Sequence, residues 1–128
     1  MKYIKLFENY TRTEFGVYTD KNKIESLWRS LEFDHPVNMP FTQDEKNELN
    51  SIMKPFGGSV YAEQGSAHIE VKTNICVVIR GYGDFCFGIF IEDINLPVDD
   101  MWIKCEIIDG FEDLCVSIKR IINEYKEL

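Results

Sequence analysis

The chain has 128 residues, of which 45% are hydrophobic and 13% aromatic, and its formal net charge is −8 at pH 7. This length predicts one domain, residues 1–128, with a core large enough to fold without disulfide or metal staples. An acidic chain offers no concentrated basic face, which excludes nucleic acid and anionic membrane surfaces as expected partners. No apolar run reaches the roughly 20 residues of a membrane span, and Glu8 interrupts the start too early for a signal peptide, so we expect a cytoplasmic protein.

The first half of the chain predicts helices. Residues 3–10 favour a short helix, with a short strand as the alternative, and Phe15 to Tyr18 could form an edge strand. A firmer helix starts at Asp20 and ends before Pro36, because proline disfavours helical angles in the residue before it. The apolar residues of that helix recur at i, i+3, i+4 and i+7: they are Ile24, Leu27, Trp28 and Leu31.

A second helix is expected from Thr42 to about Phe56. Thr42 and Glu45 have the spacing of a capping box, in which each side chain bonds the backbone of the other residue. Leu49 and Ile52 give the helix an apolar side, and Gly57 follows its end.

The segment from Ser59 to Ile108 predicts an antiparallel meander of four to five strands, because apolar and other residues alternate along it. One face is predicted to be apolar, with Ile69, Val71, Ile75, Val77, Ile79, Phe87, Ile89, Ile91, Cys105 and Ile107. The other face is predicted to be mixed, with Val78, Phe90, Trp102 and Ile108 among His68, Glu70, Lys72, Arg80, Lys104 and Glu106.

The C-terminal segment, capped by Asp109 and ending at Leu128, predicts one strongly amphipathic helix with an apolar stripe from Phe111 to Tyr125. Its apolar stripe should pack on the apolar face of the sheet. The whole pattern indicates an α+β fold with N-terminal helices, an antiparallel sheet and a C-terminal helix on one sheet face.

The mixed face leaves two interpretations open. In the first, the helices around Trp28 and Ile52 cover its apolar centre. In the second, the face is open and binds a small molecule or nucleotide, with Phe90 and Trp102 as a stacking floor and Arg80 and Lys104 as charge readers: the candidate ligand-binding residues are Arg80, Phe90, Trp102 and Lys104.

His68 and Glu70 are the weak candidates for catalysis. They are two residues apart on one face of a predicted strand, which is the arrangement of a general acid–base pair. No nucleophile is placed beside them by spacing, so a small enzyme stays an alternative and the protein is expected not to be an enzyme.

No metal or cofactor is expected from the sequence. The four cysteines, Cys76, Cys86, Cys105 and Cys115, form no C-x-x-C pair and are predicted to be free, buried thiols. The carboxylates around Pro97 do not have the spacing of an EF-hand loop.

Negative charge is concentrated late in the chain. Residues 65–128 carry twelve acids and six bases, and eight of those acids lie between Glu92 and Asp113, with Lys104 as the single base among them. Such a stretch favours a basic protein partner. The predicted partner-binding residues are Glu92, Asp93, Asp99, Asp100, Asp109 and Asp113.

The opening MKYIKLFENY, together with an Ile-, Asn- and Lys-rich composition, resembles small uncharacterised intracellular proteins of phages and low-GC bacteria. The resemblance covers residues 1–10 and implies no functional residue. It implies a setting in which small acidic proteins work by binding, as inhibitors or accessory factors. The leading hypothesis is therefore a non-enzymatic binding protein for a basic protein partner, either a monomer or a homodimer.

Overall fold

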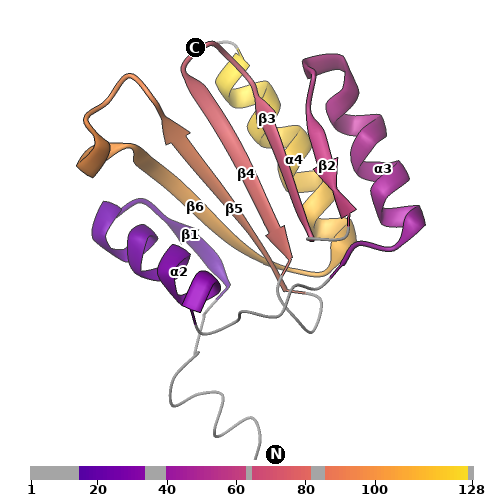
Figure 1. The fold of residues 1–128 in the computed structure, drawn as a ribbon, viewed down its shortest axis with the longest axis horizontal. Helices are drawn as coiled ribbons and strands as arrows, with labels where there is room; N and C mark the ends of the chain where they lie inside the picture. The colour runs from indigo at the N-terminus through magenta and orange to yellow at the C-terminus, as the bar shows by residue number, and fades with distance from the viewer. Residues whose placement is uncertain (1–14, 34–39, 63–64, 82–85, 127–128) are drawn as a thin grey trace, which may run out of the picture.

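The computed structural model describes residues 15–33, 40–62, 65–81 and 86–126 (Figure 1). The helix expected within residues 3–10 lies outside these ranges. The described elements are β1 (Gly16–Tyr18), α2 (Lys21–Phe33), α3 (Gln43–Met53), the 3-10 turn η1 (Lys54–Phe56), β2 (Ser59–Tyr61), β3 (Ser66–Glu70), β4 (Ile75–Gly81), β5 (Cys86–Asp93), the 3-10 turn η3 (Val98–Asp100), β6 (Trp102–Asp109) and α4 (Phe111–Lys126).

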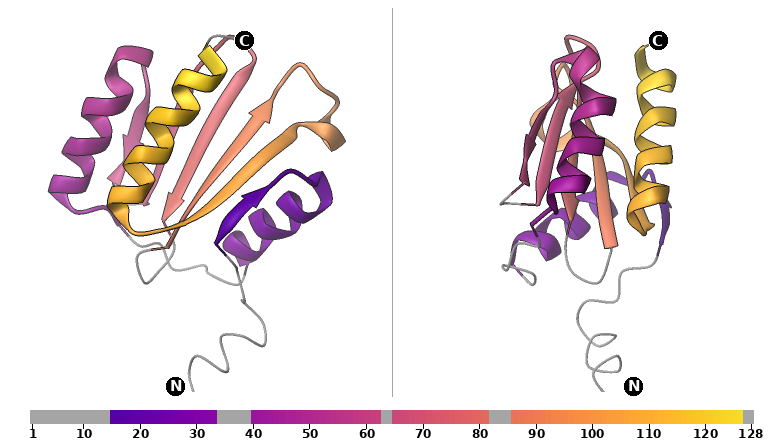
Figure 2. Two further views of the ribbon diagram at one scale, coloured as in Figure 1. Left: turned by 180° about the vertical axis from the view of Figure 1, so that it is seen from behind. Right: turned by 90° about the vertical axis from the view of Figure 1, so that its right-hand side faces the viewer.

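The described strands form one six-stranded sheet in the order β1-β6-β5-β4-β3-β2, with every neighbouring pair antiparallel. The α+β class is confirmed, with at least one strand more than expected. Helix α4 lies on one face of the sheet and α2 lies on the other, over β6, while α3 runs beside β2 and next to α4 (Figure 2). The molecule thus has a central sheet with helices on both sides.

The helices α2 and α3 begin at the capping residues that the sequence pattern predicts. The Asp20 carboxylate accepts hydrogen bonds from the backbone N–H groups of Asn22 and Lys23, 2.8 and 3.1 Å away. At α3, the Thr42 hydroxyl accepts from the Glu45 N–H at 3.2 Å, and the Glu45 carboxylate accepts from the Thr42 N–H at 2.8 Å. The capping box predicted from the sequence is confirmed.

The α4 face of the sheet carries the main core. The aliphatic stripe of α4 is buried against the central strands, as the sequence predicts, and α3 adds Leu49 and Met53. Buried members of this core include Ile69, Ile75, Val77, Ile79, Phe87, Ile89, Ile91, Leu114, Ile118 and Ile121.

A smaller core lies between α2 and the opposite face. Ile24 and Leu27 of α2 are buried there with Phe90 of β5. The Trp28 ring meets Phe90 edge-on at a centroid distance of 5.0 Å and lies 5.2 Å from Trp102. The helix around Trp28 therefore covers part of the mixed face, whereas the Ile52 helix, α3, packs on the other side.

The structure corrects the predicted facing of β6. Cys105 pairs with Phe90, so it lies on the α2 face, while Lys104 pairs with Ile91 and lies on the α4 face. The reason is a β-bulge: Ile91 is opposite Lys104, but the next residue, Glu92, is opposite Trp102, which leaves an extra residue in β6. One extra residue exchanges the two faces of a strand, because side chains alternate with a period of two.

The bulge places charges inside the α4 face. Glu106 is only 4% exposed, and its carboxylate accepts a hydrogen bond from the Arg120 guanidinium of α4. Lys104 Nζ lies 3.6 Å from the same carboxylate, and Arg120 also donates to Glu124 at 3.0 Å. This ion cluster joins β6 to α4.

No helix within the described residues is long and apolar enough to cross a membrane. Cys76, Cys105 and Cys115 are free, buried thiols, and Cys86 is half-buried.

Candidate functional site

The acidic stretch predicted as one partner-binding surface is divided by β6. Asp99 and Asp100 precede this strand, and Asp109 ends it. Eight residues of strand span about 25 Å at roughly 3.3 Å per residue. Glu92 and Asp93 belong to the first end and Asp113 to the second, so the six residues form two separate groups.

Two acids of the first group have internal partners. The Asp93 carboxylate accepts from the Asn74 side-chain amide and from the Asn95 N–H, both at 3.0 Å. Asp100 forms an ion pair with Lys21, which raises the pKa of that lysine through the hydrogen bond and the opposite charge. These contacts connect loops to the fold, so they give the two carboxylates a structural role.

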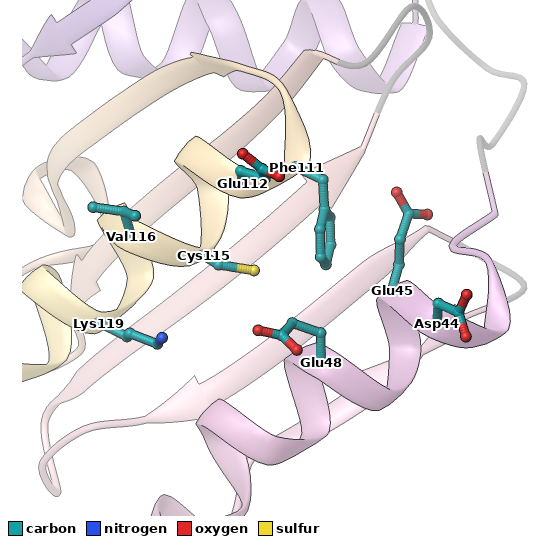
Figure 3. Close-up of a pocket in the computed structure, with 8 residues that line it drawn as sticks. All are labelled: Asp44, Glu45, Glu48, Phe111, Glu112, Cys115, Val116 and Lys119. Atoms are coloured by element: carbon teal, nitrogen blue, oxygen red, sulfur yellow. The ribbon is translucent and has the colours of Figure 1, made fainter.

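The first turn of α4, which holds Asp113 of the second group, borders a groove between α3 and α4. The groove has a volume of about 440 Å³ and is open to the surface (Figure 3). Its lining residues are Asp44, Glu45 and Glu48 from α3 and Phe111, Glu112, Cys115, Val116 and Lys119 from α4.

The groove combines an apolar floor with acidic walls. Phe111 and Cys115 extend from α4 toward α3, and the Glu48 side chain extends back toward them (Figure 3). Val116, at the α4 wall, is 64% exposed. Burial, followed by the charge of Glu48, raises the pKa of the Cys115 thiol to about 11. The local field is thus negative, with Lys119 as the one base among the lining residues.

Part of this negative charge stabilises the helices themselves. Asp44 and Glu45 lie in the first turn of α3, and Glu112 lies in the first turn of α4, where carboxylates interact favourably with the helix dipole. Glu48 lies beyond the first turn of α3, so the dipole does not account for its position in the groove.

The four residues predicted to bind a small molecule do not form one site. Arg80, Phe90 and Trp102 are on the α2 face, whereas Lys104 is on the α4 face. Phe90 is 0% exposed under Trp28, so no ligand can stack on it. The Arg80 guanidinium lies over the Trp28 ring, 5.5 Å from its centroid, and has a packing role there.

His68 and Glu70 do lie together, and the structure adds Cys76 to them. Glu70 is opposite Cys76 in the β3–β4 pair, and one donor atom from each of the three side chains lies within 4.8 Å of the others. This association could not be predicted from the sequence, because Cys76 becomes a neighbour only once the register of the hairpin is known. Burial raises the pKa of the Cys76 thiol, and the charges of Glu92 and Glu70 raise it further, which is the opposite of an activated nucleophile.

The groove was missed as well. Its acids are visible in the sequence as the first turns of two helices, but only the fold places α3 next to α4. Comparisons with protein-family models, curated proteins and solved structures gave no match.

Proposed function

We propose that the protein is a non-enzymatic binding protein that holds a basic segment of a protein partner in the groove between α3 and α4. The observation that carries the proposal is the combination of an apolar floor, formed by Phe111 and Cys115, with carboxylates from both walls. An inhibitor or accessory factor in a phage or bacterial setting would act in this way.

The chemistry of the groove defines the segment that it fits. An apolar side chain of the partner would occupy the floor, where burial of apolar area supplies affinity. Lys or Arg side chains on either side would meet Glu48 and Glu112, and this complementarity would accelerate association and select the partner. An acidic segment would be rejected, because like charges would be brought together.

The proposal can be tested with a displayed library of random 15-residue peptides sorted on the full chain. We expect the retained peptides to contain Lys or Arg next to an aromatic or aliphatic residue. Their affinity should fall at least tenfold on the double substitution Glu48→Lys/Glu112→Lys. It should also fall as salt is raised, because exposed charge pairs are screened.

The matched control is Asp99→Lys/Asp100→Lys, which makes the same charge change at the far end of β6. This variant should bind the retained peptides within about twofold of the unaltered chain at 0.15 M salt, because the two ends are separated by more than the Debye length of roughly 8 Å. Retention of neutral or acidic peptides would contradict the proposal. Equal losses in both double variants would also contradict it, since they would show that overall charge and not the groove determines binding.

A further inference from the structure

The end of the α2 face formed by β3, β4 and β5 carries a second chemical feature, independent of the groove. Glu70, Cys76 and Glu92 lie side by side on consecutive strands, because Glu70 pairs with Cys76 and Cys76 pairs with Glu92. His68 precedes Glu70 by two residues and so shares its face. Four ionisable side chains are thereby gathered on one surface of the sheet.

The surface is accessible from solvent at this end. Glu70 is exposed and His68 is half-buried, while Cys76 forms a buried base beneath them. Helix α2 packs over β6, the strand beyond β5, where Trp28 contacts Phe90 and Trp102. An ion could therefore reach His68 and Glu70 directly.

The three donor atoms have the spacing of a metal site that needs little adjustment. One nitrogen of His68, one oxygen of Glu70 and the sulfur of Cys76 are mutually within 4.8 Å. Zinc bonds of 2.0–2.3 Å in a tetrahedron put ligand atoms roughly 3.4–3.8 Å apart. A change in the rotamer of the exposed Glu70 side chain can supply a shift of about 1 Å.

The electrostatics of the surface favour a divalent cation. No ion pair connects Glu70 or Glu92 to a lysine or arginine within the described residues. Glu70 and Glu92 lie opposite Cys76 on the neighbouring strands β3 and β5, so two carboxylates flank the thiol. They would attract a cation, and a bound cation would stabilise the thiolate that it ligates.

We infer that His68, Glu70 and Cys76 form a binding site for zinc. The donor set selects the metal: a thiolate and an imidazole disfavour calcium and magnesium, which take oxygen ligands, and suit zinc or cobalt. Three protein ligands leave one tetrahedral position for water, on the solvent side of the sheet. Glu92, opposite Cys76 on β5, adds negative charge beside the ion.

Cobalt(II) titration of the full chain, kept reduced, tests the inference directly, because a cobalt–thiolate bond gives a charge-transfer absorption band and tetrahedral cobalt gives strong visible bands. We expect one equivalent of cobalt to bind with both features, and stoichiometric zinc to remove them. Cys76→Ser should abolish the charge-transfer band, whereas Cys86→Ser, a thiol on the adjacent strand β5, should leave it unchanged.

Glu70→Gln keeps the test decisive if Cys76→Ser does not fold, since Glu70 is exposed and its amide has the same shape. It should weaken cobalt binding at least tenfold, and Glu48→Gln in the groove should not change it. Absence of the charge-transfer band at millimolar cobalt would overturn the inference. Persistence of the band in a folded Cys76→Ser chain would also overturn it, since the metal would then be held by another cysteine.

Discussion

The two faces of the sheet differ in how completely they are closed. On the α4 face, α4 and α3 together cover the central strands, and even the charged Glu106 is buried. On the α2 face, one helix covers β6 and part of β5, while His68 and Glu70 of β3 remain accessible. The same sheet thus has a closed apolar side and a side that is closed only in part.

The two faces therefore have different roles: the closed face stabilises the fold, and the accessible end of the other face carries ionisable side chains. The closed face buries most of the aliphatic side chains, so it supplies most of the hydrophobic stabilisation. The accessible end of the other face holds His68, Glu70 and Cys76, which add little apolar contact. Substitutions in the closed face should accordingly cost more stability than substitutions in the other face.

The largest effect is expected from Ile118→Ala in the centre of the α4 face. Ile118 is fully buried, and removing its methyl and methylene groups leaves a cavity among packed side chains. The free energy of unfolding should fall by about 3–4 kcal/mol. Urea unfolding measures it, and Val116→Ala, at an exposed aliphatic position of the same helix, should change it by less than about 0.5 kcal/mol. Equal losses at the two positions would show that α4 is not docked as described.

Trp28→Ala tests the α2 face. The ring is half-buried and contacts only Phe90 and Trp102 among the aromatic residues described, so the expected loss is about 2–3 kcal/mol, less than at Ile118. Trp28→Phe should recover about half of it by restoring an aromatic contact. If Trp28→Ala cost more than Ile118→Ala, the α2 face and not the α4 face would be the main core.

Arg120→Met examines the charges buried in the closed face. The substitution leaves Glu106 with Lys104 as its remaining ion-pair partner among the described residues, so the free energy of unfolding should fall by about 2 kcal/mol. Arg29→Met removes a similar i,i+4 pair on the surface of α2, and it should cost less than about 0.5 kcal/mol. A loss below 0.5 kcal/mol for Arg120→Met would mean that solvent reaches Glu106 in solution.

Much of the closed face could be predicted from the sequence. The stripe of α4, the alternation in β4 and β5 and the capping box at Thr42 are local signals, and each led to the observed element. The facing of β6 could not be predicted, because a single bulged residue reverses a strand without a local signature. Lys104 was therefore assigned to the wrong face.

The candidate sites were less predictable than the fold, because each depends on distant segments. His68 and Glu70 could be paired by strand alternation alone, but Cys76 joins them only through the register of β3 and β4. Glu48 and Glu112 face the same groove only because α3 and α4 pack together. Residue type and spacing gave no signal for either association.

The smallest change in stability is expected from the buried thiols, whose pKa values depend on how far the covering helices exclude water. Burial, with a smaller contribution from Glu106, raises the pKa of Cys105 on the α2 face to about 12, compared with about 11 for Cys115 of α4. At Cys76, on the accessible end, burial also raises the pKa. The covered part of the α2 face therefore excludes water from Cys105, which is 0% exposed.

A thiol whose pKa is raised by folding makes the free energy of unfolding decrease as the pH rises. Between pH 9 and about 12, the Cys105 thiol of the unfolded chain loses its proton while the folded chain keeps it, so stability present below pH 9 is lost as pH rises. From pH 8 to pH 10, the unaltered chain should lose about 1 kcal/mol more of its free energy of unfolding than Cys105→Ala, as measured by urea unfolding at both pH values. The other titrating groups are common to both chains and cancel in this difference. Equal losses in the two chains would show that water reaches Cys105 beneath α2, and that the α2 face is open along its whole length.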